Sequence, residues 1–455
     1  MPQIEAFRGI RYDLGHVGSL SSVVAPPYDV IDAELKAELE AANPHNVVRL
    51  ILSEDRPGDN DQENRYTRSA HTMRDWRRDN VLFEEGDPAV YVYHQAYKVG
   101  SQEFIRRGFM CRVRLEPFGT GQVFPHEETH GGAKADRLKM WRACRANLSQ
   151  IFGLFPDEEN QAQTLLDQAV AGVAPLEATD HLGVVNRLWP VTDVATISAV
   201  QKAMGGRPVY IADGHHRYET ACAYRDEVAT QYAEQNGGAE LPTDHPANYV
   251  LMMCVSMSDT GMQVLPTHRL FRGMAAMNFE QLAENLGDSF TTEVIAEGPK
   301  AAPEVWERVE LEDDQGVLAL YTAEDSKWTL CRVTDAGRAK MAAAAPDRSD
   351  DWRGLGVSLL HKLIVEELLG VAEAQAPKYP RAIEEVVEGL EQGDDTGRDL
   401  TGQVGSGGKF ELAAIVMPAS IDDIRRVSNH NERMPAKSTY FYPKVLSGLV
   451  INPLE

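Results

Sequence analysis

The sequence predicts an α+β fold with a smaller α+β subdomain inserted into its core. Helical and strand patterns alternate irregularly along the chain, and residues 274–350 carry a helix-then-strands pattern of their own. With 455 residues, the chain is long enough for about three units and for a large core without disulfide support. We expect an N-terminal core over 1–273, the inserted subdomain over 274–350, and a segment over 351–455 that completes the core.

The first half of the chain predicts two helices, a strand pair and a strand–helix unit. Residues 32–42 form a short helix that an acidic residue opens, and residues 65–80 form a second helix. Residues 89–99 alternate and are rich in Tyr and Val, which favours a strand, and 104–115 is its expected partner. The apolar run 207–212 predicts a strand that leads into a long helix over 218–236.

The second half predicts a hairpin, the inserted segment and the closing strands. Residues 248–257 and 262–271 flank SDTG, a hairpin signal. A helix over 278–286 precedes strands at 316–322 and 328–333, and MAAAAPDRSD at 341–350 is typical of a linker. We expect 357–369 to be a helix packed on the core, and 410–417 and 440–451 to be strands.

Charge and cysteine content exclude several classes of protein. The net charge of -24 repels nucleic-acid backbones and anionic membrane surfaces. No basic segment followed by an apolar stretch opens the sequence, and no apolar run approaches the ~20 residues of a membrane span. The five cysteines are scattered and form no C-x-x-C pair, so we expect reduced thiols in a cytoplasmic protein.

The segment IADGHHRYETA holds the strongest candidate site. A strand ends at Ala212, a polar loop follows over 213–217, and a helix begins near Tyr218. A loop at the amino end of a helix favours phosphate, because free N–H groups and the helix dipole point at it. Gly214 permits close approach, and Arg217 offers a planar fork that matches phosphate oxygens. Alternatively, Asp213 only caps the helix and the histidines are surface residues.

The segment HEETH at 126–130 matches the H-E-x-x-H zinc pattern. That pattern needs a helix, but Pro125 precedes it and Gly131-Gly132 follows, leaving barely one turn. A zinc hydrolase is therefore an unlikely alternative. The polar set His126, Glu127, Asp136 and Arg137 remains a candidate for function on a loop.

Two further loops carry candidate residues, and one glycine-rich segment resembles a phosphate-binding motif without matching it. In VVAPPYDVID, Asp29 follows a double Pro and is a candidate base or metal ligand, or else a helix cap. In MPAKSTYF, Lys437 and its two hydroxyl neighbours are candidate phosphate contacts, or else a solvated turn. GQVGSGGKF at 402–410 resembles a P-loop, but Phe410 replaces the magnesium-binding hydroxyl, which favours a hairpin turn. No G-x-G-x-x-G follows a strand, so dinucleotide binding has no support.

The motifs APPYDVI, HEETHGGAKADR, IADGHHRYETA and MPAKSTYFYPKVLSGLV, in this order, resemble domain-of-unknown-function family 1015. The family is grouped with the ParB/sulfiredoxin-like superfamily, which implies a mixed-sheet core of that type. Sulfiredoxins, ParB-type nucleotidases and free serine kinases share a Gly-x-x-Arg phosphate loop, which 214–217 fits. Two features depart from the family pattern: the second His of HEETH, and the absence of a Gly-Gly in YPRAIEEVVEGLEQG.

The resemblance implies a nucleotide-dependent phosphotransferase that acts on a small hydroxylated metabolite, with free serine as the best candidate. Alternatives are a phosphoserine-type phosphatase and a nucleotide-binding, ParB-like regulatory module. ATP or ADP and Mg²⁺ are the expected cofactors, and a homodimer is a further expectation. The expected catalytic residues are Asp29, Glu127, Asp213, His215 and His216, with Asp213 and Glu127 as metal ligands. The expected phosphate or nucleotide contacts are His126, Arg137, Gly214, Arg217, Arg269, Lys437, Ser438 and Thr439.

Overall fold

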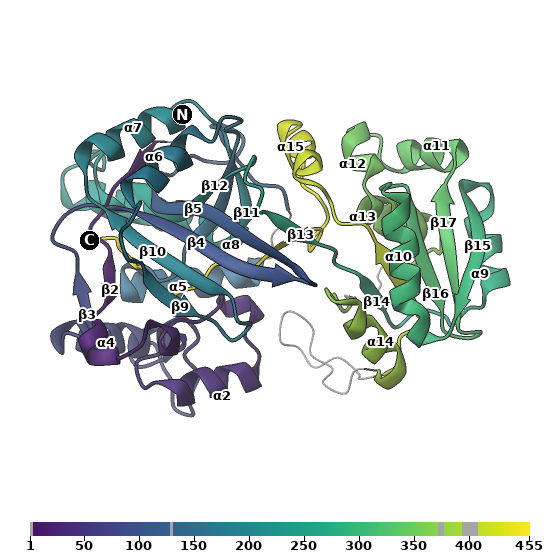
Figure 1. Ribbon diagram of the computed structural model, residues 1–455, viewed down its shortest axis with the longest axis horizontal. Coiled ribbons are helices and arrows are strands. Elements are labelled where there is room, and N and C mark those ends of the chain that lie inside the picture. The colour runs from purple at the N-terminus through teal and green to yellow at the C-terminus, as the bar shows by residue number, and fades with distance from the viewer. Residues whose placement is uncertain (1–2, 128–130, 372–376, 394–407) are drawn as a thin grey trace. The chain divides into compact units, whose positions relative to one another are not determined.

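A computed structural model describes residues 3–127, 131–371, 377–393 and 408–455. It divides the chain into two compact units (Figure 1). The first unit comprises Met1–Pro125, Thr129–Gln263 and Pro443–Glu455, and the second comprises His126–Glu128 and Val264–Tyr442. The segment 274–350 lies within the second unit, which extends beyond it at both ends. The predicted three-part division stays a prediction.

The first unit is built on a mixed sheet of nine strands among the described residues. Eight strands follow the order β6-β11-β8-β12-β5-β4-β10-β9, and β1 pairs with β5. The pairs β6/β11 and β8/β12 are parallel and the others antiparallel. The strands are β1 (Ile4–Glu5), β4 (Val90–Val99), β5 (Gln102–Arg114), β6 (Val123–Phe124), β8 (Ile151–Phe155), β9 (Leu176–Thr179), β10 (Val185–Val191), β11 (Val209–Asp213) and β12 (Tyr249–Ser256).

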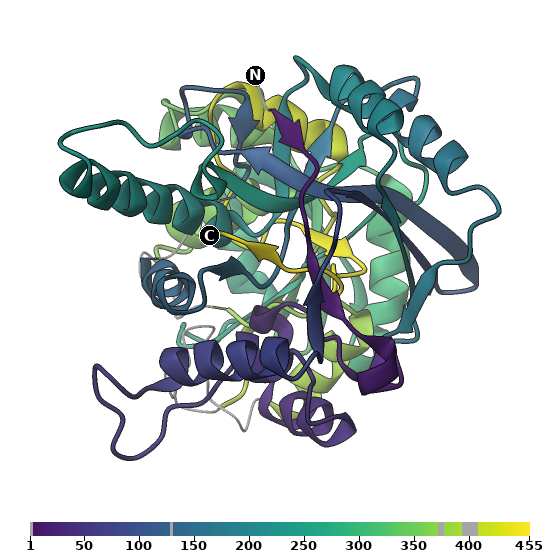
Figure 2. The ribbon, with the colours of Figure 1, turned by 90° about the vertical axis from the view of Figure 1, so that its left-hand side faces the viewer.

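Every residue of β12 is buried, as expected for an apolar strand inside a sheet. Two short pairs, β2 (Ile10–Tyr12) with β3 (Leu82–Glu84) and β7 (Ala146–Asn147) with β20 (Asn452–Pro453), accompany the sheet. The C-terminal segment, yellow in Figure 2, lies along the N-terminal one, where the Ile451 carbonyl accepts from the Ile10 N–H at 2.9 Å. The last residues of the chain therefore belong to the first unit.

The helices of the first unit begin at recognisable caps. The Asp32 and Asn64 side chains accept hydrogen bonds from the first turns of α2 and α4, and Asp193 does so for α7. The helices are α1 (Leu14–Val17), η1 (Leu20–Ser22), η2 (Tyr28–Val30), α2 (Ala33–Ala42), α3 (Val48–Ile51), α4 (Arg65–Arg78), α5 (Gly131–Cys144), α6 (Gln161–Ala169), α7 (Val194–Met204), α8 (His215–Gln235) and η3 (Pro246–Asn248).

The second unit has an antiparallel sheet of order β14-β18-β16-β17-β15. Trp328, Leu330 and Ile415 are among the residues of its core, against which α10 and α14 pack. The strands are β13 (Gln263–Leu265), β14 (Arg269–Phe271), β15 (Phe290–Glu297), β16 (Val317–Thr322), β17 (Lys327–Val333), β18 (Leu412–Val416) and β19 (Tyr440–Tyr442). The helices are α9 (Phe279–Leu286), η4 (Gly287–Ser289), η5 (Pro299–Ala301), α10 (Ala302–Glu312), α11 (Asp335–Ala344), α12 (Asp350–Gly354), α13 (Gly356–Ser358), the π-helix η6 (Leu359–Leu368), α14 (Ile383–Gln392) and α15 (Ile421–Asn429).

The large mixed sheet agrees with the predicted α+β class, and four local predictions are wrong. The expected hairpin at SDTG does not form, because β5 and β8 already occupy both edges of β12. The expected strand over 440–451 ends at Tyr442, because Pro443 has no N–H to continue a ladder. The expected linker begins inside α11, since its alanines favour helix and Pro346 then ends it. Finally, α8 begins at His215, three residues before the expected start.

Candidate functional site

The connection between β11 and α8 is shorter than the sequence predicts, because a single residue, Gly214, separates them. The pairing of β11 with β8 shifts register between Ile211 and Asp213, and such bulges commonly redirect a side chain beside a site. Gly214 then adopts φ 91° and ψ 29°, a left-handed conformation that favours glycine. It occupies the N-cap position of α8 and has no side chain with which to cap that helix end. The N-cap position is thus taken by Gly214 rather than by Asp213.

Asp213 is instead held between two cations. Its Oδ2 lies 2.5 Å from Nη2 of Arg217, and its Oδ1 lies 2.7 Å from Nζ of Lys444. Nη1 of Arg217 also donates to the Gln150 carbonyl. The three ionised side chains are only 7% to 16% exposed and carry one net positive charge. A buried, net cationic cluster beside a helix start favours an anion.

The segment that carries Lys444 is fixed by a buried polar network. Nε2 of Gln95 donates to the Lys444 carbonyl at 3.0 Å, and Nη2 of Arg106 donates to the Pro443 carbonyl at 2.5 Å. Arg106 is fully buried and lies over the Phe152 ring at 4.7 Å from its centroid. Burial lowers the pKa of Arg106. The network therefore fixes the backbone from which the Lys444 ammonium extends.

A second arginine lies next to this cluster. The guanidinium of Arg137, from α5, stacks over the Tyr28 ring at 4.0 Å. A small cavity of about 10 Å³, roughly the space of one water molecule, is lined by Tyr28, Arg137, Ser149 and Arg217, among others. Burial, followed by the neighbouring Asp29 carboxylate, raises the pKa of Tyr28. With Lys444, all four motifs named above therefore contribute to one region of the first unit.

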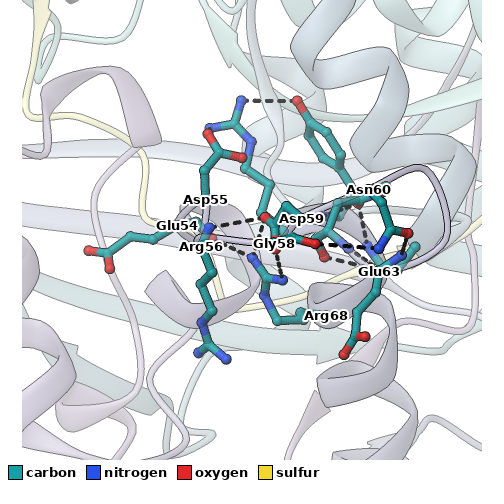
Figure 3. A network of polar contacts seen from close by, with 12 residues as sticks. Glu54, Asp55, Arg56, Gly58, Asp59, Asn60, Glu63 and Arg68 are labelled. Atoms are coloured by element: carbon teal, nitrogen blue, oxygen red, sulfur yellow. Dashed lines mark hydrogen bonds and ion pairs between the residues drawn. The ribbon is translucent and has the colours of Figure 1, made fainter.

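Asp136 orients the neighbouring Arg137, whose Nε donates to its Oδ2 at 2.7 Å. Burial raises the pKa of Asp136, but its bonds and ion pairs outweigh this and the net shift is downward. Arg65 donates to its Oδ1 at 2.6 Å from the start of α4. The loop before α4 is held in turn by Arg68, whose guanidinium makes two bonds to Asp59 at 2.6 and 2.8 Å (Figure 3).

The remaining predicted residues of the first unit differ in exposure. His215 is buried in the first turn of α8, and His216 is half-buried beside it. Asp29 is exposed in the 3-10 turn η2, and the cap of the following helix is Asp32. Asp29 is thus accessible to a ligand, whereas His215 is not.

The second unit contains the other predicted residues. Oε1 of Glu127 accepts from the Thr439 N–H at 3.0 Å and from its hydroxyl at 2.9 Å. Nε2 of the buried His126 lies 2.8 Å from the same hydroxyl oxygen. Arg269 is fully buried and donates to the Lys437 carbonyl at 2.8 Å. Ser438 donates to the Pro435 carbonyl at 2.5 Å.

The zinc pattern falls partly outside the described residues, which end at Glu127 and resume at Gly131. Glu127 forms a parallel bridge with Met434 rather than a helical turn, and the glycine pair opens α5 rather than ending a helix. A zincin site requires both histidines on one helix. The segment at 402–410 also lies largely outside the described residues.

The predicted residues thus form two clusters, one in each unit. Asp29, Arg137, Asp213, Gly214, His215, His216 and Arg217 lie in the first, and His126, Glu127, Arg269, Lys437, Ser438 and Thr439 lie in the second. Among the described residues, no group of three or more His, Cys, Asp or Glu side chains is placed to hold a metal ion. Within the same residues, no helix is both long and apolar enough to cross a membrane.

Lys444 is the functional candidate that sequence reasoning missed. Its distance of 231 residues from Asp213 hides the contact from any local pattern. The signal was nonetheless present, because the FYPKVLSG segment quoted for the family resemblance contains this lysine. No sequence pattern marked Gln95 or Arg106 as functional, since they alternate with ordinary strand residues.

The fold and the cluster define a mixed α/β protein with a buried cationic site at a helix start. Residues 4–358 match the family described as "Protein of unknown function (DUF1015)". The chain belongs to this family. The matched region includes the Asp213–Arg217 segment and ends before Lys444. No curated protein matches the sequence.

Several solved structures share limited likeness with the chain. A free serine kinase in complex with AMP aligns at 12% identity and a TM-score of 0.32, over 70% of this chain and 83% of that one. A variant of free serine kinase in complex with ADP gives 12% and 0.33, over 70% and 84%. A C-terminally truncated SbnI from Staphylococcus aureus gives 12% and 0.34, over 76% and 87%. TM-scores of this size do not establish a shared fold.

Proposed function

We propose that the chain is a nucleotide-dependent phosphotransferase for a small hydroxylated metabolite, with free serine as the first candidate. The observation that carries the proposal is the Asp213–Arg217–Lys444 cluster at the start of α8. Phosphoryl transfer asks mainly for positioning and charge neutralisation, which cations and helix N–H groups provide. A ParB/sulfiredoxin-like core, implied by the family resemblance, is part of the proposal.

Each residue has a proposed role. Arg217, Lys444 and the first-turn N–H groups of α8 hold the nucleotide phosphates. The bond from the terminal phosphorus to the nucleotide oxygen breaks, and a bond to the metabolite hydroxyl oxygen forms. The hydroxyl proton passes to Asp29 or His216, of which Asp29 is the more exposed.

ATP or ADP is the proposed donor, with Mg²⁺ as its companion. Mg²⁺ in such sites is held by one or two carboxylates together with phosphate oxygens. Both oxygens of Asp213 are in ion pairs, so a metal there would replace a cation. Glu127 accepts two bonds from Thr439 through Oε1. The metal-binding roles of Asp213 and Glu127 therefore remain proposals.

The test combines turnover with affinity. Protein is incubated with ATP or ADP, Mg²⁺ and free serine or a pool of hydroxylated metabolites, and phosphorus NMR follows the products. We expect a new phosphate monoester to appear as nucleotide is consumed. Arg217→Lys keeps the charge but loses the fork, so nucleotide affinity should fall by about 1–3 kcal/mol on titration calorimetry.

Arg225→Lys is the matched control, because Arg225 lies on the same helix and pairs with the exposed Asp226 at 2.7 Å. Its nucleotide affinity should stay unchanged. Binding without turnover would instead support a regulatory module, and release of phosphate from phosphoserine without nucleotide would support a phosphatase. Unchanged affinity in Arg217→Lys would remove the basis of the proposal.

A further inference from the structure

Side chains of the first unit hold the backbone around Lys444. The Lys444 carbonyl accepts from Nε2 of Gln95 at 3.0 Å, and the carbonyl before it accepts from Nη2 of Arg106 at 2.5 Å. Two residues further on, the Leu446 carbonyl accepts from Nε2 of Gln150 at 2.8 Å. A ladder between strands tolerates many different side chains, whereas this attachment depends on the chemistry of a few particular ones.

The amide of Gln95 uses its full hydrogen-bonding capacity. Its Oε1 accepts from Nε of Arg106 at 3.1 Å and also from Nη2 of the same guanidinium. Its Nε2 donates to Oδ1 of Asn186 and to the Lys444 carbonyl, both at 3.0 Å. A side-chain amide has two N–H donors and an oxygen with two lone pairs, so no capacity is left over. Because Gln95 is fully buried, a change of its amide leaves at least one partner without a hydrogen bond, which is costly.

The orientation of this amide follows from its neighbours. Arginine offers only N–H donors, so the amide oxygen must face Arg106 and the NH₂ group must face the Lys444 carbonyl. Asn186 supports the same orientation, because its Oδ1 accepts from Gln95 and also from the Tyr93 hydroxyl at 2.5 Å. The side chains of Gln95, Asn186 and Tyr93 are all fully buried. Strands β4 and β10 therefore present the donor to Lys444 in one orientation.

The Lys444 ammonium extends from this backbone to Asp213. Nζ lies 2.7 Å from Oδ1 of Asp213, and the lysine side chain is only 12% exposed. A lysine stem is flexible, so the position of its charge depends on where the backbone is held. Charge–charge energy changes with separation, and it changes most where water is largely excluded. The hydrogen bond from Gln95 therefore influences how strongly Lys444 acts on Asp213 and on a bound anion.

We propose that Gln95 is a positioning residue of the Asp213–Arg217–Lys444 cluster. Through the Lys444 carbonyl it sets the place of the ammonium, and thereby the affinity of the cluster for phosphate, without touching the ligand itself. The effect on phosphate rests on the proposed function, whereas the effect on the contact between Lys444 and Asp213 does not. Arg106 acts one step further away, by orienting the amide.

Two substitutions separate the donor of this amide from its acceptor. Gln95→Leu removes both groups. Gln95→Glu keeps an acceptor for Arg106, but it loses the donor and places a second acceptor against the Lys444 carbonyl. If positioning requires the donor, both variants release Lys444.

The first measurement needs no ligand. The full-length chain is treated with limiting acetic anhydride, and mass spectrometry gives the rate of acetylation at Lys444 relative to the exposed Lys202. We expect slow acetylation of Lys444 in the wild type, because its ammonium is paired and largely buried. In Gln95→Leu and Gln95→Glu the rate should rise roughly tenfold, the size expected for one lost hydrogen bond.

Gln163→Leu is the matched control. Gln163 is a second buried glutamine of the first unit, on α6. Its amide bonds to Asp167 at 2.7 Å and lies 3.3 Å from the His94 ring, rather than holding the segment of Lys444. The variant therefore loses a buried amide as well, but its acetylation rate at Lys444 should stay at the wild-type value.

The second measurement is a double-mutant cycle on phosphate affinity. Inorganic phosphate is titrated by calorimetry in Mg²⁺-free buffer against the wild type, Gln95→Leu, Lys444→Met and the double variant. We expect Gln95→Leu to weaken binding roughly tenfold. In the Lys444→Met background the same substitution should have no further effect, because one residue then acts only through the other. A merely structural role would lower affinity in both backgrounds.

Three results would overturn the proposal. They are unchanged acetylation of Lys444 in Gln95→Leu, an equal rise in Gln163→Leu, and an equal loss of phosphate affinity with and without the Lys444 ammonium. Thermal unfolding checks that each variant is folded, and Gln95→Glu decides if Gln95→Leu is not. If the wild type binds neither phosphate nor nucleotide, the proposed function fails, and acetylation alone decides whether Gln95 positions Lys444.

Discussion

Replacing Asp213 by asparagine separates a structural role from a metal-binding one. The carboxylate lies between Arg217 at 2.5 Å and Lys444 at 2.7 Å, and all three side chains are largely buried. Removing one partner of a buried ion pair costs about 3–5 kcal/mol, because the other charge stays buried without compensation. Since Asp213 retains 16% exposure, we take the lower end, about 3 kcal/mol.

Amide hydrogen exchange measures this loss of stability in individual segments of the chain. A decrease of about 3 kcal/mol accelerates exchange roughly 150-fold in the segments that open with the site. Peptides from β11 and the start of α8 should show this change, while peptides from α10 in the second unit serve as an internal reference. Asp226→Asn on the same helix is the matched control, because that exposed pair contributes little.

The same substitution should raise the affinity for phosphate although it lowers stability. Without Asp213, the cluster carries two net positive charges rather than one, so phosphate binding in Mg²⁺-free buffer should tighten by roughly tenfold. A metal-ligand role predicts weaker nucleotide binding in the presence of Mg²⁺ instead. The structural reasoning is refuted if exchange in β11 matches the wild-type rate, or if phosphate affinity without Mg²⁺ falls.

Three further perturbations follow from particular contacts. Gly214→Ala introduces a Cβ about 3.0 Å from the Arg217 guanidinium at a positive φ, so it should lower both stability, by about 2 kcal/mol, and anion affinity. Gly237→Ala, at a similar φ with no atom within 4 Å, should leave affinity intact. The pKa of His361, about 3 when folded, is below its unfolded value. The unfolded state therefore binds more protons below about pH 6.5, and acidification to pH 5 should cost about 2 kcal/mol. Thermal unfolding of His361→Gln at pH 7 and pH 5 should show this pH dependence reduced, and an unchanged dependence would contradict it. Thr439→Val removes the hydroxyl that bridges the buried histidine and carboxylate of the second unit, and denaturant unfolding should show a loss of about 2 kcal/mol. Thr439→Ser, which retains that hydroxyl, should lose less.

The sequence correctly predicted those helices and strands that are determined by their own residues. The strand pair β4 and β5, the helix α4 and the helix α9 all appear where alternation or caps indicate them. The hairpin at SDTG failed because the decisive factor was not local. A turn signal shows that the chain can reverse, whereas pairing depends on which strands already occupy the edges of β12.

The candidate site likewise contains residues that local patterns predicted and residues that they missed. Gly214 and Arg217 were visible because a glycine and an arginine follow a strand within a few residues. Lys444 acquires its significance only when the C-terminal segment returns to the first unit. Its position there depends on Gln95 and Arg106, which lie on β4 and β5. No spacing rule connects these residues, because the fold alone brings them together.

The buried charges of the Asp213–Arg217–Lys444 cluster should act on a ligand more strongly than the net charge of the chain does. The charged side chains that sum to -24 are spread over the whole sequence. Salt screens the interaction of exposed charges with a ligand beyond about 8 Å. Arg217 and Lys444 are screened less, since they are largely buried. Asp213 permits this burial because its carboxylate pairs with both cations. We expect a cation at the start of α8 to compete with both basic side chains, whereas an anion would be attracted by them. Under the proposed function, the Asp213–Arg217–Lys444 cluster would therefore favour an anionic ligand over a cationic one.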